Sequence, residues 1–502
     1  MSAPEVSVSG GTITQVDADT LVCWVPEGSS RLSGQAAQID RATNGAIARM
    51  IRDGLITGRS GETTVVHGGR LKAHRVVVVG AGKSEPFDAN AERRASGNLA
   101  RTLRGMDAGR VAWSTQSYAS GSVDTELASA ARVEGVLMGL YRFDRHHTKE
   151  ADRPRGNVSS VVFVEASARA AAAAQRGLAQ GVALAEATNF ARDLANEPAN
   201  LMTPTVMATR AQEMAAREGL ECTVIERAEA ERLGMGSYLS VANGSHQPPK
   251  FIVLRYRGAN DAQPVALIGK GITFDTGGTS IKPAAGMERM KGDMSGAASV
   301  LGAMMAIARL KPPASVLGVA PCTENMPGGG ATKPGDVVYA MDGQSIEVIN
   351  TDAEGRLILA DGVAYAKSQG ATPLIDIATL TGAINVALGG VRFGVHTNND
   401  ALMADLERAS ERSGEKLWRM PMDREYFEQI KSDVADVKNT GGAPAGSITG
   451  AKLIEMFAGD TPWAHLDIAG VMDVSRDRGE WVKGMSGQPV RTLVHLVLNR
   501  AR

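Results

Sequence analysis

The octapeptide at residues 350–357 reads Asn-Thr-Asp-Ala-Glu-Gly-Arg-Leu and carries three ionisable side chains at alternate positions: Asp352, Glu354 and Arg356. In an extended segment, alternate residues point to the same face. We therefore expect the two carboxylates and the guanidinium to converge on one spot. Apolar residues flank the octapeptide, which indicates a largely buried setting. Buried carboxylates are costly unless a cation compensates them, and a metal ion is the expected compensator.

A second group of charged residues lies upstream, in a glycine-rich and otherwise apolar region. It consists of two lysines and two aspartates: Lys270, Lys282, Asp275 and Asp293. If these aspartates meet the two carboxylates of the octapeptide, the cluster carries about four negative charges, which two divalent cations would balance. Two-metal hydrolases hold their ions about 3.5–4 Å apart in such a setting. The residues alone would equally serve a two-metal phosphoesterase.

Several segments of the chain resemble the signatures of the leucyl aminopeptidase family, whose members are cytosolic two-metal exopeptidases. The octapeptide matches the hallmark of that family at every position, and the segments 269–283 and 290–298 match two further signatures. The resemblance covers roughly residues 185–500 and decides between peptidase and phosphoesterase. Other matching segments are Asn196-Glu197-Pro198-Ala199-Asn200 with Thr203-Pro204, residues 376–383 (Asp-Ile-Ala-Thr-Leu-Thr-Gly-Ala) and residues 463–470 (Trp-Ala-His-Leu-Asp-Ile-Ala-Gly).

The resemblance implies a set of metal ligands. Asp275 and Glu354 would bridge two ions, Asp293 and Lys270 would complete one site, and Asp352 would complete the other. An amine coordinates a metal only when it is deprotonated, so Lys270 would need a strongly lowered pKa. The alternative is that Lys270 is an ion-pair partner of Asp275. A carboxylate-rich site with one nitrogen donor favours Mn²⁺, Zn²⁺ or Mg²⁺.

The resemblance also implies the catalytic groups for cleavage of a peptide bond. Lys282 would stabilise the developing oxyanion; the alternative is a solvated surface lysine. Arg356 would hold a bicarbonate that acts as general base, with the backbone of Gly355 and Leu380 as further donors. The alternative for Arg356 is an ion pair with the carboxylates of its own octapeptide.

An apolar pocket should select the first residue of the peptide. Methionine side chains form adaptable apolar walls, which suits leucine-like residues, although ordinary core packing would also explain them. The free α-amine of the substrate would meet a metal ion and Asp293, so that cleavage occurs from the N-terminus. The pocket positions implied by the resemblance are Met290, Thr379, Gly382, Ala469 and Met472.

Composition limits the remaining classes of function. The chain has 502 residues, of which 43% are hydrophobic, and a net charge of −1. The near-zero charge does not indicate nucleic-acid or membrane binding, although some relatives combine peptidase and DNA-binding roles. A non-catalytic regulator built on this fold is the alternative from another class, and the intact ligand set argues against it. Three scattered cysteines, and no signal peptide or long apolar run, predict a cytoplasmic protein.

The alternation of apolar runs and helical segments predicts two α/β domains joined by a helix. We expect an N-terminal α/β domain over residues 1–165, whose role is open, with assembly as one candidate, and an alanine-rich linker helix over 166–195. A catalytic domain over 196–502 should hold a central, mainly parallel sheet flanked by helices. The segment 80–83 (Gly-Ala-Gly-Lys) is an incomplete phosphate-loop motif. The family resemblance implies a homohexamer.

Overall fold

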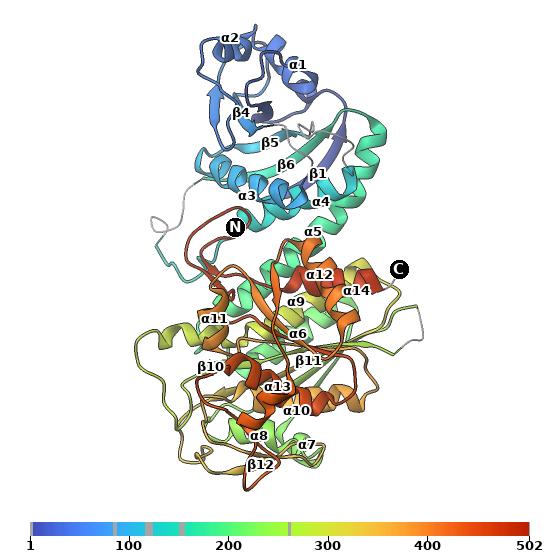
Figure 1. Cartoon of the computed structure of the whole chain (residues 1–502). Helices are drawn as coiled ribbons and strands as arrows, with labels where there is room; N and C mark the ends of the chain where they lie inside the picture. Colours follow the sequence, from blue (N-terminus) through green and yellow to red (C-terminus); the bar gives the residue numbers. More distant parts are fainter. Residues whose placement is uncertain (1–3, 84–87, 116–123, 150–155, 260–262, 501–502) are drawn as a thin grey trace. The chain divides into compact units, whose positions relative to one another are not determined.

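The computed structural model describes residues 4–83, 88–115, 124–149, 156–259 and 263–500, and the described chain divides into two compact units (Figure 1). Unit 1 comprises residues 1–186 and 476–482, and unit 2 comprises residues 187–475 and 483–502. The alanine-rich linker is a single helix, α5 (Ala168–Asn196), and the boundary between the units falls within it. The predicted domain limits at residues 165 and 195 stay a prediction.

Unit 1 contains a six-stranded sheet in the order β1-β6-β5-β2-β4-β3. Its neighbouring strands are parallel except for β3, which runs antiparallel to β4. The strands are β1 (Glu5–Gly10), β2 (Thr20–Pro26), β3 (Thr63–Val66), β4 (Arg75–Gly82), β5 (Gly109–Ser114) and β6 (Val158–Glu165). The helices other than α5 are α1 (Gly34–Ala42), α2 (Ala46–Arg52), α3 (Ala89–Gly105) and α4 (Thr125–Gly139).

Unit 2 is built on a nine-stranded sheet in the order β16-β15-β18-β14-β9-β11-β8-β7, with β10 paired to β11. Its centre is parallel, because β18, β14, β9 and β11 all run the same way. The strands are β7 (Glu221–Ile225), β8 (Lys250–Tyr256), β9 (Val265–Gly269), β10 (Gly271–Asp275), β11 (Val316–Asn325), β14 (Leu374–Ala378), β15 (Phe393–Thr397), β16 (Leu417–Arg419) and β18 (Trp463–Asp467).

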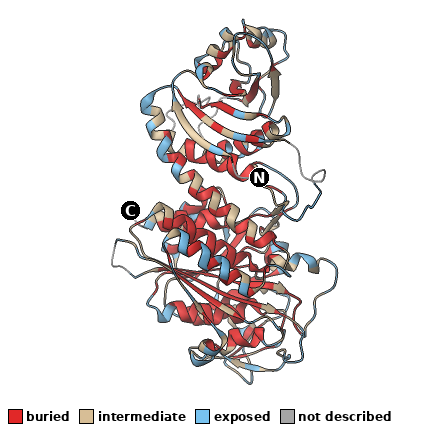
Figure 2. Ribbon diagram, turned by 180° about the vertical axis from the view of Figure 1, so that it is seen from behind, coloured by how far each residue is buried: buried red, intermediate tan, exposed pale blue. Residues whose placement is uncertain are grey.

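Helices cover the large sheet, and smaller sheets complete unit 2. Figure 2 shows the strands of this sheet buried and the outer surfaces of its helices exposed. The helices are α6 (Pro204–Glu218), α7 (Arg227–Arg232), α8 (Gly236–Ala242), α9 (Ser295–Leu310), α10 (Gly355–Ser368), α11 (Gly382–Leu388), α12 (Asp400–Ser413), α13 (Gly446–Ala458) and α14 (Val490–Arg500). The remaining strands are β12 (Val337–Tyr339), β13 (Ser345–Glu347), β17 (Val437–Lys438), β19 (Asp473–Val474) and β20 (Gly484–Met485).

The predicted fold class, an α/β protein with a mainly parallel, helix-covered sheet, is confirmed. The sequence shows why these segments are strands: β9 is a continuous apolar run, β14 is apolar except for Asp376, and every residue of both is buried, as expected for parallel strands covered on both faces. No described helix is long and apolar enough to cross a bilayer.

The large sheet opens at Lys270, and this opening positions the candidate site. Strand β9 lies between β14 and β11, and the chain continues after Lys270 as β10. Among the described strands, β10 pairs only with β11. The sheet therefore splits between β10 and β14 at the carboxyl ends of its parallel strands, which is where ligands bind in open α/β sheets.

Candidate active site

Three buried carboxylates meet where the sheet splits. Asp275 is the last residue of β10, Asp293 lies in the 3-10 segment η3 (Met287–Met294), and Glu354 immediately precedes α10. Each side chain is almost wholly buried, and one oxygen from each lies within 4.8 Å of the others. Three predicted ligands, separated widely in the sequence, are therefore neighbours in space.

Lys270 lies among these carboxylates. Its Nζ is 2.8 Å from Asp293 Oδ2 and 2.7 Å from Glu354 Oε1, and it donates a hydrogen bond of 3.1 Å to the Thr379 carbonyl. The predicted alternative partner, Asp275, is not within ion-pair distance of this ammonium among the described contacts. Lys270 thus joins two carboxylates that belong to different loops.

A second lysine holds the remaining pair of carboxylates. Lys282 Nζ lies 2.8 Å from Asp275 Oδ2 and 2.5 Å from Asp352 Oδ1. The Lys282 side chain is 20% exposed and that of Asp352 is 33% exposed, so this side of the site is open to solvent. Lys282 is therefore not a freely solvated surface lysine.

Burial and charge shift the pKa values of these groups. Burial, together with the neighbouring carboxylates, raises the pKa of Glu354 to about 8 and that of Asp293 to about 6, although Lys270 opposes both shifts. Burial lowers the pKa of Lys270, but Asp293 and Glu354 outweigh it, and the net direction is upward. Without a metal ion, Lys270 is therefore an ammonium; coordination by its amine requires release of the proton.

The octapeptide is not extended, and this expectation was wrong. Thr351 and Asp352 form a turn, Glu354 has helical dihedral angles (φ −78°, ψ −30°), and Gly355 begins α10. The apolar side chains of the segment that starts at Leu357 are buried, which favours a helix that packs against the sheet. As a result the three charged side chains have separate partners rather than one shared face.

Arg356 makes no ion pair with a described carboxylate. Its Nη1 donates a hydrogen bond of 2.6 Å to the Asn439 carbonyl, and its buried Nε has no hydrogen-bond partner among the described residues. Burial lowers the pKa of Arg356 to about 10, although Glu354 and Asp467 act in the opposite direction. A buried guanidinium with an unused donor is suited to an anion.

Further polar residues hold the loops of the site in place. Asn325 Nδ2 donates to Asp275 Oδ1 and to the Thr351 carbonyl at 2.8 and 3.0 Å. Asn439 binds the loop before α10 through the Ile349 amide (2.8 Å) and the Asn350 carbonyl (2.6 Å). Neither asparagine was predicted from the sequence. Asn325 could have been found, because it ends a strand that runs parallel to the one ending at Asp275.

Asp467 and Thr379 fix a third loop. The buried Asp467 carboxylate accepts hydrogen bonds from the Leu380 amide (3.2 Å) and the Thr381 hydroxyl (2.6 Å). Thr379 Oγ1 donates to Asp293 Oδ1 at 2.6 Å. Thr379, predicted to line the substrate pocket, thus contacts both Lys270 and a carboxylate of the site. The Leu380 amide, predicted to bind bicarbonate, is already bonded to Asp467.

The other predicted pocket residues are not wholly buried. Met290 lies in η3 beside Asp293, and the exposed Gly382 begins α11. The Ala469 amide donates to Asp467 Oδ1 at 3.3 Å. Met472 lies near Gly292: a Cβ added at Gly292 would be 3.9 Å from the Met472 sulfur. Met290 and Met472 therefore both lie close to the segment that carries Asp293.

The residues present fit a divalent metal ion. The cluster offers hard oxygen donors in a buried pocket, and the buried Glu354 Oε2 accepts no hydrogen bond from the described residues. The two lysine ammoniums supply positive charge of the kind that metal ions would supply.

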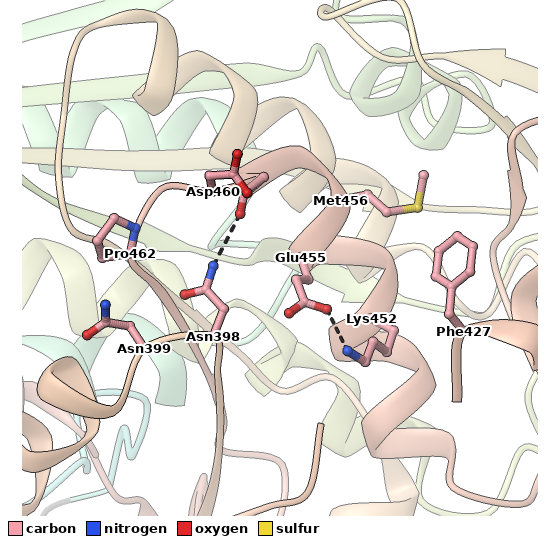
Figure 3. A pocket seen from close by; sticks show the side chains of 9 residues that line it. Asn398, Asn399, Phe427, Lys452, Glu455, Met456, Asp460 and Pro462 are labelled. Atoms are coloured by element: carbon pink, nitrogen blue, oxygen red, sulfur yellow. Dashed lines mark hydrogen bonds and ion pairs between the residues drawn. The ribbon is translucent and has the colours of Figure 1, made fainter. Parts of the chain in front are cut away.

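A separate pocket lies at the opposite end of the strands from the carboxylate site, and Figure 3 shows the residues that line it. Asn398 and Pro462 line it, and they lie next to the end of β15 and the start of β18, whereas Asp467 ends β18 at the carboxylate site. Figure 3 shows Lys452 paired with Glu455, and their Nζ–Oε2 distance is 2.8 Å. This pocket is not part of the candidate active site.

An α/β fold with a buried carboxylate cluster at the carboxyl ends of its strands fits the class of metal-dependent hydrolases. The cytosol aminopeptidase family, catalytic domain, matches residues 189–494, and the N-terminal domain of the same family matches residues 24–150. The chain therefore belongs to the cytosol aminopeptidase family, which consists of metal-dependent aminopeptidases, and the predicted family is confirmed.

Individual relatives agree over nearly the full length. A probable cytosol aminopeptidase of Geobacter sulfurreducens is 45% identical over 491 residues, which is 97% of this chain and 98% of the relative. A bottromycin maturation enzyme, BotP, solved in complex with Mn, has a TM-score of 0.85 at 33% identity and covers 97% of this chain and 100% of its own. A mutant of tomato leucine aminopeptidase has a TM-score of 0.86 at 32% identity, covering 99% and 97%.

The buried histidines beside the site should make stability depend on pH. Burial and the neighbouring His465 hold the pKa of His396 well below its ordinary value. The unfolded chain therefore binds one more proton below about pH 6.5, and stability is lost as the pH falls, by up to about 1.4 kcal/mol per pH unit. We expect the free energy of unfolding of His396→Gln, measured in urea, to depend less on pH between pH 7 and 5 than that of the wild type.

The exposed His67→Gln variant is the matched control for the replacement of one histidine by glutamine. The pKa of His465 is raised, because Asp376 outweighs the effect of burial. His465 therefore stabilises the folded state as the pH falls, which is opposite to the effect of His396. It is present in both variants and does not affect their comparison. If the free energy of unfolding of His396→Gln falls with pH as steeply as that of the wild type, the buried His396 is not the source of the pH dependence.

Proposed function

We propose that this protein is an aminopeptidase that releases N-terminal, preferably leucine-like, residues from peptides. The cluster of Asp275, Asp293 and Glu354 around the Lys270 ammonium is the observation that carries the proposal. The family match and the leucine aminopeptidase fold support the peptidase activity.

Two divalent metal ions, held by these three residues with Asp352 and the deprotonated Lys270, would supply a water of lowered pKa as the nucleophile. Mn²⁺, Zn²⁺ and Mg²⁺ suit this donor set, and the Mn complex of BotP supports the first. Asp293 would also accept a hydrogen bond from the free α-amine of the substrate, which explains why residues are released from the N-terminus.

Lys282 would stabilise the oxygen of the scissile carbonyl. Its ammonium is only partly exposed and lies between Asp275 and Asp352, so it is fixed beside the cluster rather than free in solvent. The charge is already in place as the carbonyl oxygen becomes negative, which is the form of stabilisation that catalysis uses most.

Arg356 would bind a bicarbonate as the proton acceptor. Its unused Nε and its burial support an anion there, and the start of α10 at Gly355 adds backbone N–H groups. Leu380 would contribute only if its amide left Asp467. Met290, Thr379, Gly382, Ala469 and Met472 would surround the first substrate residue.

Assembly and location complete the proposal. The family resemblance supports a homohexamer, and the role of the N-terminal domain is open, with assembly as one candidate. The relatives named as cytosol aminopeptidases support a cytoplasmic location. The domain limits proposed are 1–165, 166–195 and 196–502.

Hydrolysis of leucine p-nitroanilide tests the activity directly. Protein stripped of metal and resupplied with Mn²⁺ or Zn²⁺ should cleave the anilide. Glu354→Gln keeps the shape of the side chain but removes its charge, and we expect at least a 100-fold loss of kcat/KM together with weaker Mn²⁺ binding by calorimetry, in line with the loss of a ligand. Folded wild-type protein that cleaves no anilide with any of these metals would sink the proposal.

Gly355 should be required for the metal site because of its contact with Lys270. A Cβ at this position would lie 2.8 Å from Lys270 Cδ and 2.9 Å from its Nζ. We expect Gly355→Ala to displace the lysine and weaken Mn²⁺ binding about 10–100-fold, the usual cost of disturbing the surroundings of metal ligands. Gly329→Ala is the control, because a Cβ there meets nothing within 4 Å. Equal Mn²⁺ affinity in both variants would refute the role of Gly355.

Lys282→Ala separates catalysis from metal binding. We expect kcat to fall by about 10²–10³, the usual cost of losing an oxyanion donor, whereas Mn²⁺ affinity should stay within a few-fold of wild type. Lys291→Ala, on the neighbouring η3 segment, serves as the control. A loss of Mn²⁺ binding that accounts for the whole loss of kcat would show that Lys282 acts on the ligands and not on the substrate.

A further inference from the structure

Asp467 is the last paired residue of strand β18 in the catalytic unit. Its partner in the parallel strand β14 is Ala378, and the Ile468 amide donates one further hydrogen bond of 2.8 Å to the Ala378 carbonyl. Beyond this point the two strands continue into separate loops, residues 379–381 after β14 and residues 468–470 after β18. Three of the proposed pocket residues lie in these loops or directly after them: Thr379, Gly382 and Ala469.

The Asp467 carboxylate holds both loops through hydrogen bonds. Its Oδ1 accepts from the backbone amides of Leu380 (3.2 Å), Thr381 (3.4 Å) and Ala469 (3.3 Å). Its Oδ2 accepts from the hydroxyls of Thr381 (2.6 Å) and Ser447 (3.4 Å). Asp467 is fully buried, and a buried carboxylate is costly unless it is hydrogen-bonded. Movement of either loop away from Asp467 is therefore unfavourable.

Thr381 extends this anchor to helix α11. The Thr381 Oγ1 that donates to Asp467 also accepts a hydrogen bond of 3.2 Å from the Ile384 amide, which caps the start of the helix. Gly382 is the first residue of α11. Its position therefore depends on how Thr381 is held.

The two strands that lead into the loops are joined by side chains as well as by backbone. Asp376 of β14 accepts a hydrogen bond of 2.7 Å from Trp463 Nε1, and its Oδ1 lies 2.5 Å from His465 Nδ1. Trp463 and His465 both belong to β18, and all three side chains are fully buried. Asp467 thus extends from a strand whose position relative to β14 is fixed.

We propose that Asp467 is a positioning residue that sets the width of the pocket for the first substrate residue. The inference rests on the proposed aminopeptidase function and concerns the selectivity of the same site. One carboxylate holds the loop before Gly382 and the loop of Ala469 at a fixed separation. The walls that these loops contribute therefore stay at the distance that suits a leucine-like side chain, and a pocket whose walls separate should favour leucine less strongly over smaller residues.

Asp467→Asn tests the anchor with little change in shape. The amide loses the charge that strengthens hydrogen bonds from N–H and O–H donors, and it presents one acceptor oxygen in place of two. Asp361→Asn is the matched control. The buried Asp361 carboxylate also accepts hydrogen bonds from two backbone amides, those of Tyr238 (2.6 Å) and Met341 (2.7 Å), and neither amide belongs to the pocket loops.

Thr381→Val and Thr381→Ser form a second pair of variants. Valine is close to threonine in shape but lacks the hydroxyl that donates to Asp467, whereas serine keeps this hydroxyl. The pair tests the anchor independently if Asp467→Asn does not fold.

The first readout, with Mn²⁺ bound, is the ratio of kcat/KM for leucine and alanine p-nitroanilides. We expect this ratio to fall about tenfold in Asp467→Asn and in Thr381→Val, a loss on the scale of the discrimination that apolar pockets supply. The fall should come mainly from a higher KM for the leucine anilide, because the alanine side chain fills little of the pocket. Asp361→Asn and Thr381→Ser should keep a ratio close to that of the wild type.

The second readout is hydrogen–deuterium exchange at the Leu380 and Ala469 amides. Exchange at both should accelerate in Asp467→Asn and in Thr381→Val, whereas Asp361→Asn should accelerate exchange only at its own partner amides. Ala469 lies in the loop after β18 and not in α11, so loss of the helix cap in Thr381→Val would not by itself change its exchange.

The outcomes separate this inference from the proposed function. Wild-type protein that cleaves neither anilide would refute the aminopeptidase, and the exchange data would still show whether Asp467 holds the two loops. An active wild type whose selectivity is unchanged in folded Asp467→Asn, or in Thr381→Val if the former does not fold, would overturn the role of Asp467. An equal loss of selectivity in Asp361→Asn would also overturn it, since any weakened buried aspartate would then have the same effect.

Discussion

The compensation of buried negative charge is the constraint on which the rest of this structure depends. Asp275, Asp293 and Glu354 bring oxygens within 4.8 Å of one another inside the protein, where like charges repel strongly and desolvation is costly. Lys270 and Lys282 each bridge two carboxylates. Removal of one of these cations would leave buried charge unpaired, which is far more damaging than loss of a surface ion pair.

The break in the sheet makes this concentration of charge possible. Strand β9 is hydrogen-bonded to β14 on one side and to β11 on the other, whereas β10 pairs only with β11 among the described strands. Lys270 lies at the break and reaches the Thr379 carbonyl at the end of β14. Its ammonium therefore also joins the two strands where their backbone pairing has ended.

Rigid support of the loops is the second requirement, because metal sites and oxyanion sites lose activity when their groups shift by about 1 Å. Asn325, Asn439 and Asp467 each use a buried side chain to fasten backbone of a loop around the cluster. These contacts replace regular hydrogen-bonded structure in loops that must leave the sheet.

Local sequence determined the charged residues, the family and most of the secondary structure. The apolar runs of β9, β11 and β14 and the alanine-rich α5 follow from composition and periodicity alone, and the resemblance to the family signatures predicted that Asp275, Asp293 and Glu354 meet. Only the tertiary structure decided how the octapeptide folds: burial of the apolar face of α10 overrides the extended form that alternating charges suggested. It also decided the partners of Arg356 and the role of Asn439, which lies 89 residues from Asn350. Such contacts are set by the packing of distant segments and leave no local pattern in the chain.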